Sequence, residues 1–359
     1  MAPKRQAQGA GSSSRPQKKT HVDVNPETQD KLHAWVLGDR STPWYNDGDI
    51  LLKANGKFFR VHVSVLAGAS GYFQDLVPSI EQGEKLFEGC AVLEINCSDR
   101  KLRHVLRALY KRSFEDLSRL PETVELEAWL HLATNFRIWP LRQEAIDCIL
   151  DAYPPDLKTF EDRLEACCVA ESKGNRTLDA MLVAFLAMDH DLDTFLPSIL
   201  YACCQSRLGM LGIYQILDET QRYAKRLKRQ KFTFDAFFDL YGDIMEKCYA
   251  GFSRLAVAHH DLLMAVFDAK FSPRCDQTLE CRITLGILRE RAFVMGDRPS
   301  IPRLDWLKDL DTAGKLCPPC HEYTRQITAV KRQEIWQRLP DIFDLDKHPD
   351  VAHGPRGRS

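Results

Sequence analysis

The fold of the N-terminal part of the chain is decided by one stretch, Asp47-Gly48-Asp49-Ile50-Leu51-Leu52-Lys53-Ala54-Asn55-Gly56-Lys57-Phe58-Phe59-Arg60-Val61-His62. Two apolar runs in this stretch are separated by Asn55-Gly56. Both of these residues tolerate the positive φ angles that a type I′ turn requires, and Asn-Gly between apolar runs is the strongest short-range signal of a β-hairpin. The stretch therefore predicts a strand, a tight turn and a second strand.

The residues on the C-terminal side of this hairpin predict a helical cluster and one more strand. Residues 63–76 favour two short helices that break near Ser70-Gly71. A polar loop then leads to a third strand at 91–95, and Ser98-Asp99 caps a helix after it. One face of that helix carries Leu102, Val105, Leu106, Leu109 and Tyr110. With two more helices before Pro154-Pro155, this order predicts a compact α+β module.

Composition excludes several classes of protein. The 359 residues are 44% hydrophobic and 28% charged, which is typical of globular proteins, and the length favours two domains. The longest apolar runs, such as residues 181–188, are shorter than the roughly 20 residues of a membrane span, so we expect no membrane-spanning segment. The N-terminus lacks the apolar region of a secretory signal, and we expect a cytoplasmic or nuclear protein. With a net charge of -1, nucleic-acid binding would need a local basic patch.

The two ends of the chain have compositions typical of disordered tails. Residues 1–24 are rich in Gly, Ser and Gln, and their basic pairs at 4–5 and 18–19 resemble a split nuclear-import signal. A solvated tail without such a role is the alternative. Residues 25–44 are predicted to be a linker or a short helix, and residues 346–359 a second disordered tail.

Residues at fixed offsets in the N-terminal module resemble the BTB/POZ domain in the form found in fungal BTB proteins. The matching motifs are Asp47-Gly48-Asp49-Ile50, Phe59-Arg60-Val61-His62, Ser70-Gly71-Tyr72-Phe73 and Leu106-x-x-Leu109-Tyr110. The resemblance covers residues 45–152. It implies the BTB/POZ fold, with a structural signature formed by Asp49, His62, Phe73, Leu106 and Tyr110.

The resemblance also implies a function. BTB/POZ domains are non-enzymatic protein-interaction modules that homodimerise, and some are substrate adaptors of cullin-based ubiquitin ligases. Cullin recruitment in the family uses an apolar-x-Glu triplet in the loop before the third strand, which Leu86-Phe87-Glu88 matches. Many animal members place a basic residue after the histidine and use it in a charged pocket. This chain has Val63 there, so the resemblance does not extend to that pocket.

The second half of the chain, residues 157–345, is helical by pattern. The adjacent pairs Cys167-Cys168 and Cys203-Cys204 are interpreted as thiols packed in the core. Residues 222–231 carry many Lys and Arg side chains. We interpret them as a solvated face, with contact to nucleic acid or to an import receptor as the alternative.

Four of the twelve cysteines have a spacing that suggests a metal site. Cys275-x5-Cys281 is followed, after 35 residues, by Cys317-Pro318-Pro319-Cys320. A Cys-x2-Cys pair can bind one tetrahedral ion, and a second pair can complete a structural zinc site. Unliganded thiols, or His259, His260 or His321 in place of one cysteine, stay open. The late Cys-x-x-Cys and the motif Trp336-x-x-Leu339-Pro340-x-x-Phe343 resemble the C-terminal region of fungal BTB proteins.

These observations leave several functions to compare. A protein-interaction scaffold, acting on a protein partner or on a second copy of itself, explains the α+β module. A cullin-ligase adaptor and a nuclear, transcription-associated regulator are the alternatives. An enzyme is the least favoured, because no nucleophile and base occur together in a catalytic pattern and no Gly-rich phosphate-binding motif is present.

Overall fold

The computed structural model describes residues 36, 38–82, 85–110, 121–163, 180–205, 234–268, 272–294 and 316–345. The predicted tails at 1–24 and 346–359, the pair Cys167-Cys168 and the basic cluster 222–231 lie outside these residues. The chain divides into two units, and each is described by itself. The first contains residues up to Ser64 together with Asp75–Asp99, and the second contains Val65–Gln74 and the residues from Arg100 onward.

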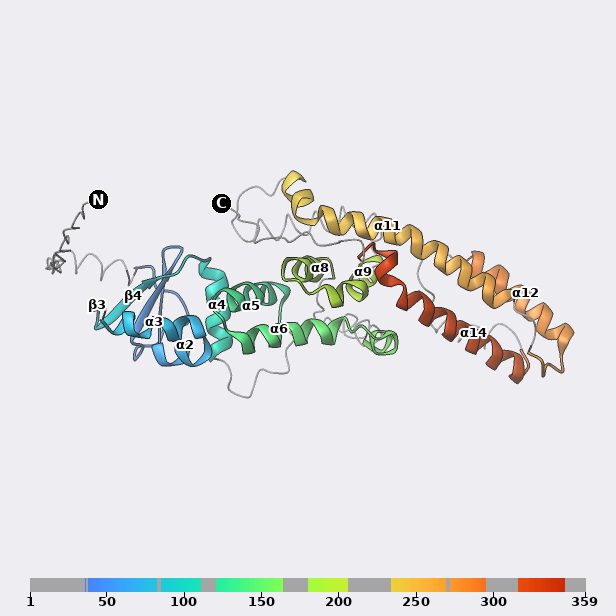
Figure 1. Ribbon diagram of the computed structural model, residues 1–359, viewed down its shortest axis with the longest axis horizontal. Coiled ribbons are helices and arrows are strands. Elements are labelled where there is room, and N and C mark those ends of the chain that lie inside the picture. Colours follow the sequence, from blue (N-terminus) through green and yellow to red (C-terminus); the bar gives the residue numbers. More distant parts are fainter. Residues whose placement is uncertain are drawn as a thin grey trace, which may run out of the picture. The chain divides into compact units, whose positions relative to one another are not determined.

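The first unit is built on a four-stranded sheet with the strand order β2-β1-β4-β3 (Figure 1). Its strands are β1 (Ile50–Ala54), β2 (Lys57–Val61), β3 (Lys85–Phe87) and β4 (Cys90–Glu94). Strand β1 pairs antiparallel with β2 and parallel with β4, so Ile50 lies opposite both Val61 and Ala91. Strand β3 pairs antiparallel with β4.

Two tight turns set the register of this sheet. Asn55 and Gly56 have φ angles of 48° and 75°, which confirms the predicted hairpin between β1 and β2. Glu88 and Gly89 have φ angles of 41° and 78° and connect β3 to β4 in the same way. The sequence predicts that residues 86–88 lie in a loop before the third strand, whereas Lys85–Phe87 form β3 and only Glu88 lies in the turn. A strand of three residues is too short to show the alternation of apolar and polar side chains that identifies longer strands.

The sheet encloses a small apolar core. Four of its members come from the four strands, and Val36 comes from the segment upstream of β1: Val36, Leu51, Phe58, Phe87 and Cys90. Trp44 packs its ring edge to face against Phe87, with 6.3 Å between the ring centroids. Phe87, although it lies next to an exposed turn, is therefore a core residue.

The predicted helix break is present. Helix α2 (Val63–Ala69) ends and α3 (Gly71–Gln82) begins on either side of Ser70. The buried Ser70 hydroxyl accepts a hydrogen bond from the Phe73 amide at 3.1 Å, so it caps the new helix, and it donates to the Phe136 carbonyl at 2.5 Å. A single serine thus ends one helix and starts the next.

The second unit is helical, and with the sheet it confirms the predicted class of an α+β module followed by a mostly α-helical region. The described elements are α4 (Asp99–Tyr110), α5 (Thr123–Asn135), α6 (Trp139–Ala152), α8 (Ala180–Asp189), the 3₁₀ turn η1 (Asp193–Phe195), α9 (Leu196–Gln205), α11 (Phe234–Phe267), α12 (Thr278–Val294), α14 (Pro318–Gln337) and α15 (Leu339–Ile342).

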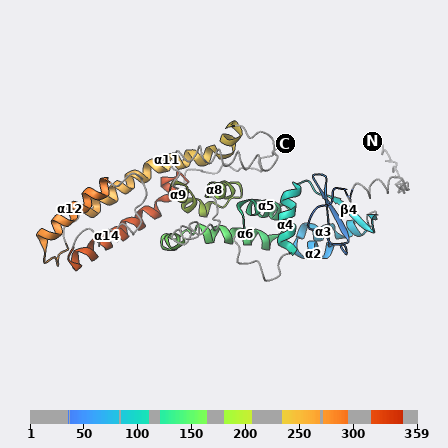
Figure 2. The same ribbon diagram turned by 180° about the vertical axis from the view of Figure 1, so that it is seen from behind.

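One continuous core joins most of these helices. Its buried side chains come from α5, α6, α8, α9, α11, α14 and α15, and from the residues between α6 and α8. Helices α11 and α14 lie side by side, as both ribbon views show (Figures 1 and 2). The core that contains α5 and α6 therefore continues past residues 152–157, the predicted boundary between the two domains. The domain limits derived from the sequence stay a prediction.

Trp336 near the end of α14 is at the centre of this core. Its ring lies 5.0 Å from that of Phe160 and 5.4 Å from that of Tyr201, and its Nε1 donates to the Pro155 carbonyl at 2.6 Å. One turn earlier, the buried guanidinium of Arg332 pairs with Glu161. Burial lowers the pKa of Arg332 to about 10, so the side chain stays charged at neutral pH and depends on that carboxylate.

Phe343, directly after α15, is accommodated by a glycine. Gly251 lies within α11, and a Cβ atom added to it would overlap the Phe343 ring. Glycine within a helix costs about 1 kcal/mol relative to alanine. Close approach of the two segments gives the physical reason for glycine at this position.

None of the described helices combines the length and the apolar composition that crossing a membrane would require.

We expect Gly251→Ala to destabilise the protein by about 1–3 kcal/mol, although alanine is the better helix former, because the new methyl group displaces Phe343 from the core. Gly242→Ala in the same helix is the matched control. A Cβ atom there meets nothing within 4 Å, so this variant should gain up to about 1 kcal/mol. Urea unfolding followed by circular dichroism measures both. Equal stabilisation by the two substitutions would contradict the packing.

Candidate functional site

Asp49, the first residue of the predicted signature, has a structural role. Its Oδ1 accepts a hydrogen bond from the Val63 amide at 2.7 Å, at the start of α2. Its own amide donates to the Val61 carbonyl at 3.0 Å. Asp49 thus connects the beginning of β1 to the end of β2 and to the positive end of the helix that follows.

His62 lies at the corner between β2 and α2. Its Nε2 is 3.4 Å from Asp47 Oδ1, and its ring packs against Tyr45 with 5.4 Å between centroids. Its side chain is 24% exposed, so it is half-buried and not a core residue. The Asp47 carboxylate is largely in solvent, and such an exposed pair contributes little to stability.

The remaining signature residues are packed in the helical unit. Phe73 is buried, and its ring lies 5.3 Å from those of Tyr72 and Phe136. Leu106 is buried on α4, and Tyr110 at the end of the same helix is half-buried. Each of the five signature side chains therefore contacts other residues of the fold. Contact of any of them with a partner stays a prediction.

The triplet Leu86-Phe87-Glu88 is divided between strand, core and surface. Phe87 is buried in the sheet core, whereas the exposed Glu88 lies in the β3–β4 turn. The Glu88 carboxylate forms an ion pair with Arg60 Nη1 at 2.5 Å. A partner that binds this turn would therefore meet Glu88 and not Phe87.

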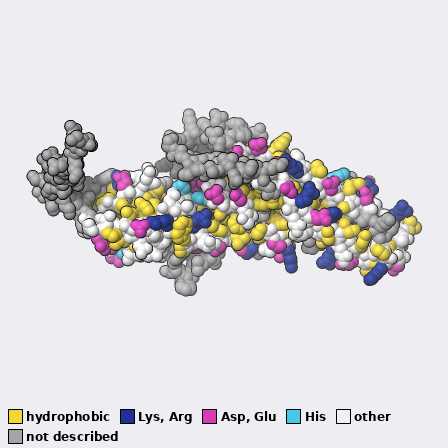
Figure 3. Space-filling model, in the orientation of Figure 1, with side chains coloured by type: hydrophobic (Ala, Val, Ile, Leu, Met, Phe, Trp, Pro, Cys, Tyr) yellow, Lys and Arg dark blue, Asp and Glu magenta, His cyan; other side chains and the backbone are white. Residues whose placement is uncertain are grey.

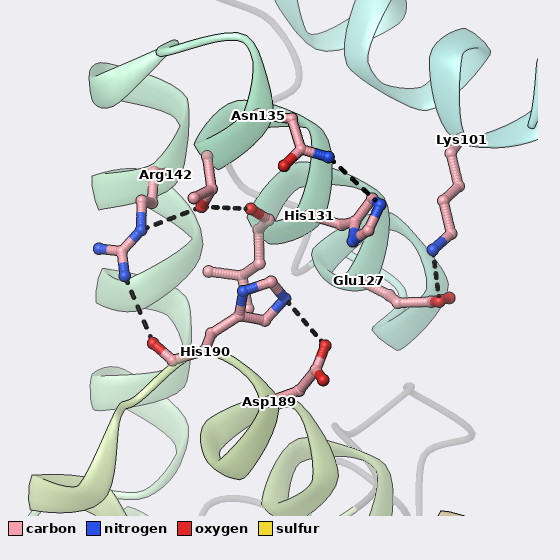
Figure 4. A network of polar contacts seen from close by, with 9 residues as sticks. Lys101, Glu127, His131, Asn135, Arg142, Asp189 and His190 are labelled. Carbon is pink, nitrogen blue, oxygen red and sulfur yellow. Dashed lines mark hydrogen bonds and ion pairs between the residues drawn. The ribbon is translucent and has the colours of Figure 1, made fainter. Parts of the chain in front are cut away.

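A polar network that no sequence motif indicated connects four helices of the second unit (Figure 4). Lys101 on α4 pairs with Glu127 on α5 at 2.9 Å. Arg142 on α6 donates to the carbonyl of His190, the residue after α8, at 3.5 Å. His131 contacts Asn135 one turn along α5. The spacing of Glu127, His131 and Asn135 at every fourth residue was the available signal, since such residues share one helix face.

Both histidines of this network, His131 and His190, have pKa values below the ordinary value for histidine. Burial lowers the pKa of His131, and the charge of Lys101 lowers it further, whereas Glu127 and Asp189 oppose the shift. Burial also lowers the pKa of His190, with His131, Arg142 and Lys101 adding to the effect and Asp189 opposing it. Both rings are therefore neutral in the folded protein at neutral pH.

The four predicted metal-ligand cysteines lie together in the helical unit. The Sγ atoms of Cys275, Cys281, Cys317 and Cys320 all lie within 4.8 Å of one another. Three of them are buried, and Cys275 is half-buried. Residues 272–281 bring the first pair to the start of α12, and the second pair is at the start of α14. None of the three histidines proposed as substitutes belongs to this group.

Backbone amides point at the sulfur atoms of this group. The Cys317 amide donates to Cys281 Sγ at 3.3 Å, and the backbone of Cys320 is hydrogen-bonded to the Cys317 sulfur. Burial raises the pKa of Cys281. Burial also acts to raise the pKa of Cys317, but its hydrogen bonds with Cys320 and the neighbouring thiols outweigh this effect and leave the pKa below its ordinary value.

Cys203 and Cys204 on α9 pack against the main core, as the interpretation of core thiols expected. The Cys204 thiol donates to the carbonyl of Cys248 on α11 at 3.6 Å.

On the face drawn in Figure 3, Lys and Arg side chains lie among Asp and Glu side chains. The described part of this face therefore offers no concentrated positive charge for nucleic acid.

Comparison with known families identifies one domain. Residues 45–151 match the model of the BTB/POZ domain. None of the curated proteins compared with the chain matches it. The resemblance to the fungal form of the family stays a prediction.

We expect Asp49→Ala to lower the free energy of unfolding by about 1 kcal/mol, because α2 loses the carboxylate at its start. The exposed neighbour Asp47 provides the matched control, and Asp47→Ala should change stability by less than about 0.5 kcal/mol. Chemical unfolding of both variants measures the difference. The capping role is wrong if the two substitutions have the same effect.

We expect stability to fall as the pH drops below about 6.5, the ordinary pKa of histidine. The folded state holds His131 and His190 neutral, so the unfolded chain binds more protons in this range. Above that pH the contribution of the two rings is fully present. Urea unfolding between about pH 7.5 and pH 5.5 should give a shallower decline for His131→Gln/His190→Gln than for the unchanged chain. Parallel curves would show that these rings do not carry the dependence.

Proposed function

We propose, from the premise that residues 45–151 are a BTB/POZ domain, that the chain is a non-enzymatic scaffold for protein–protein interaction. The family match carries this proposal, since BTB/POZ domains generally bind other proteins. A protein partner or a second copy of the chain would be the binding partner. We place the protein in the cytoplasm or the nucleus, where thiols such as those of its ten described cysteines stay reduced.

The roles of the signature residues support a binding function. Asp49 caps a helix, Phe73 and Leu106 are buried, and His62 holds a strand-to-helix corner. These side chains shape the domain and leave its surface to do the binding. A catalytic site would instead be expected to bring a nucleophile and a base into contact in a pocket.

A cullin-ligase adaptor is the second candidate, and the position of Glu88 favours it. The carboxylate projects from a two-residue turn whose backbone is fixed by the positive φ angles of Glu88 and Gly89. Its ion pair with Arg60 holds the side chain in one place. A fixed, exposed carboxylate at a loop tip is a suitable contact for a basic partner surface. The nuclear, transcription-associated alternative depends on the basic segments outside the described residues and stays a prediction.

Cross-linking of the full chain to its copurified partner tests the scaffold. We expect cross-links from the amines of Lys53, Lys57 and Lys101 within the domain, together with a mass by light scattering that exceeds one chain. Lys331 on α14, outside the matched residues, serves as the reference position. A monomer whose cross-links to other proteins all arise from Lys331 would contradict the proposal.

Charge reversal separates the adaptor from the general scaffold. We expect Glu88→Lys to weaken cullin binding by at least about tenfold, equivalent to ~1.4 kcal/mol. The new lysine would face the basic partner surface that the Glu88 carboxylate is proposed to contact, and like charges repel each other. Glu94→Lys on the adjacent strand β4 is the matched control. Glu94 is exposed and pairs with Lys53 in the same sheet, and its reversal should leave the affinity within about threefold. Binding of purified cullin, measured by calorimetry, decides. No binding by the unchanged chain excludes the adaptor and leaves the scaffold standing.

A further inference from the structure

The cysteine group joins two segments that are distant in sequence. Cys275 and Cys281 flank the first turn of α12, whereas Cys317 and Cys320 flank the prolines that open α14. The hydrogen bond between the Cys317 amide and Cys281 Sγ already crosses 36 residues of chain. Four thiols from two distant segments therefore lie together, and three of them are buried. This convergence needs a physical explanation.

The distances between the sulfur atoms fit one tetrahedral ion. A zinc–sulfur bond of about 2.3 Å places the sulfurs of a tetrahedral site about 3.8 Å apart. Cys317 Sγ lies 3.8 Å from Cys275 Sγ, and all four sulfurs lie within 4.8 Å of one another. A disulfide requires a distance of about 2.05 Å and would use only two of the four sulfurs. Four sulfurs at mutual distances near that of a tetrahedral edge favour a single shared ion.

Backbone hydrogen bonds are directed at most of the sulfur atoms. Amide hydrogen bonds reach three of the four sulfurs: from Cys317 to Cys281, from the backbone of Cys320 to Cys317, and from the backbone of Ser272 to Cys320. Cys317 occupies the position directly before α14 and Cys320 lies in the first turn of this helix, where the positive end of the helix dipole favours negative charge. Such hydrogen bonds to ligand atoms orient them and are a regular feature of metal sites.

We propose that Cys275, Cys281, Cys317 and Cys320 bind one structural Zn²⁺, which ties the start of α12 to the start of α14. Four protein ligands leave no open coordination position, so the ion has no catalytic water. On binding, each thiol releases its proton to solvent and forms a sulfur–zinc bond. No sulfur–sulfur bond forms and no electrons are transferred.

The ion would act through α14. This helix starts at the cysteine group and ends by inserting Trp336 into the main core. Fixing its first turn sets the direction along which the helix reaches that core. We therefore expect zinc to stabilise the helical unit and to leave the sheet of the first unit unaffected.

Metal analysis of the untagged full chain, purified under reducing conditions, tests the site. We expect one zinc per chain, together with four cysteines that resist alkylation until a chelator is added. Replacement by cobalt(II) should give the ligand-field absorption of a tetrahedral thiolate site. A chain that holds no zinc and takes up none after reduction overturns the proposal, as does a mass lower by two hydrogens for each disulfide. Iron in place of zinc would also overturn it.

Three variants separate metal binding from other uses of the thiols. Cys275→Ser should weaken zinc binding at least about hundredfold, because a ligand is lost. Cys275→His should keep one zinc per chain, since imidazole is a zinc ligand and cannot form a disulfide. Cys97→Ser, a half-buried cysteine of the sheet unit, is the control and should retain zinc fully. Loss of zinc in the control, or full retention in Cys275→Ser, would contradict the site. Because Cys275 is half-buried, its variants can fold, and circular dichroism checks that they do.

Discussion

The structure depends above all on the return of the C-terminal helices to a core that begins far earlier in the chain. Trp336 packs against both Phe160 and Tyr201 and donates to the carbonyl of Pro155, 181 residues before it. Arg332 brings a buried charge to the same place and pairs with Glu161. Without α14 and α15, the apolar faces of α9 and α11 would lose their covering, and burial of such faces is the main source of stability for a helical unit.

The two ends of α14 are held by different kinds of interaction. Its C-terminal end is fixed by apolar packing, because Ile335 and Trp336 are buried in the main core. Its first turn carries two of the four clustered cysteines. Apolar packing is non-directional, whereas metal coordination fixes the relative positions of its ligands. The zinc proposed for these cysteines would therefore add direction to a helix that the core already attaches.

The BTB/POZ domain and the helices after it are linked by a shared core. Helix α5 and all of α6 except its last residue lie within residues 45–151. They contribute Leu126, Leu130, Ala145 and Ile149 to the same apolar cluster as α8, α9 and α11. The polar network of Lys101, Glu127, His131, Arg142 and His190 runs over the same helices (Figure 4). The matched domain and the downstream helices are therefore packed as parts of one continuous apolar core.

Local sequence determined the elements whose signals are local. Asn55-Gly56 identified a hairpin because few other residues accept two positive φ angles, and Ser70-Gly71 marked a helix break because a serine hydroxyl can cap the next helix. The spacing of the cysteines identified the four candidate metal ligands. Only the tertiary structure decided that these four sulfurs meet, that Phe87 is in the core while Glu88 is at the surface, and that Gly251 receives Phe343. Each of these depends on contacts between residues far apart in the chain, and no periodicity within one segment encodes such contacts.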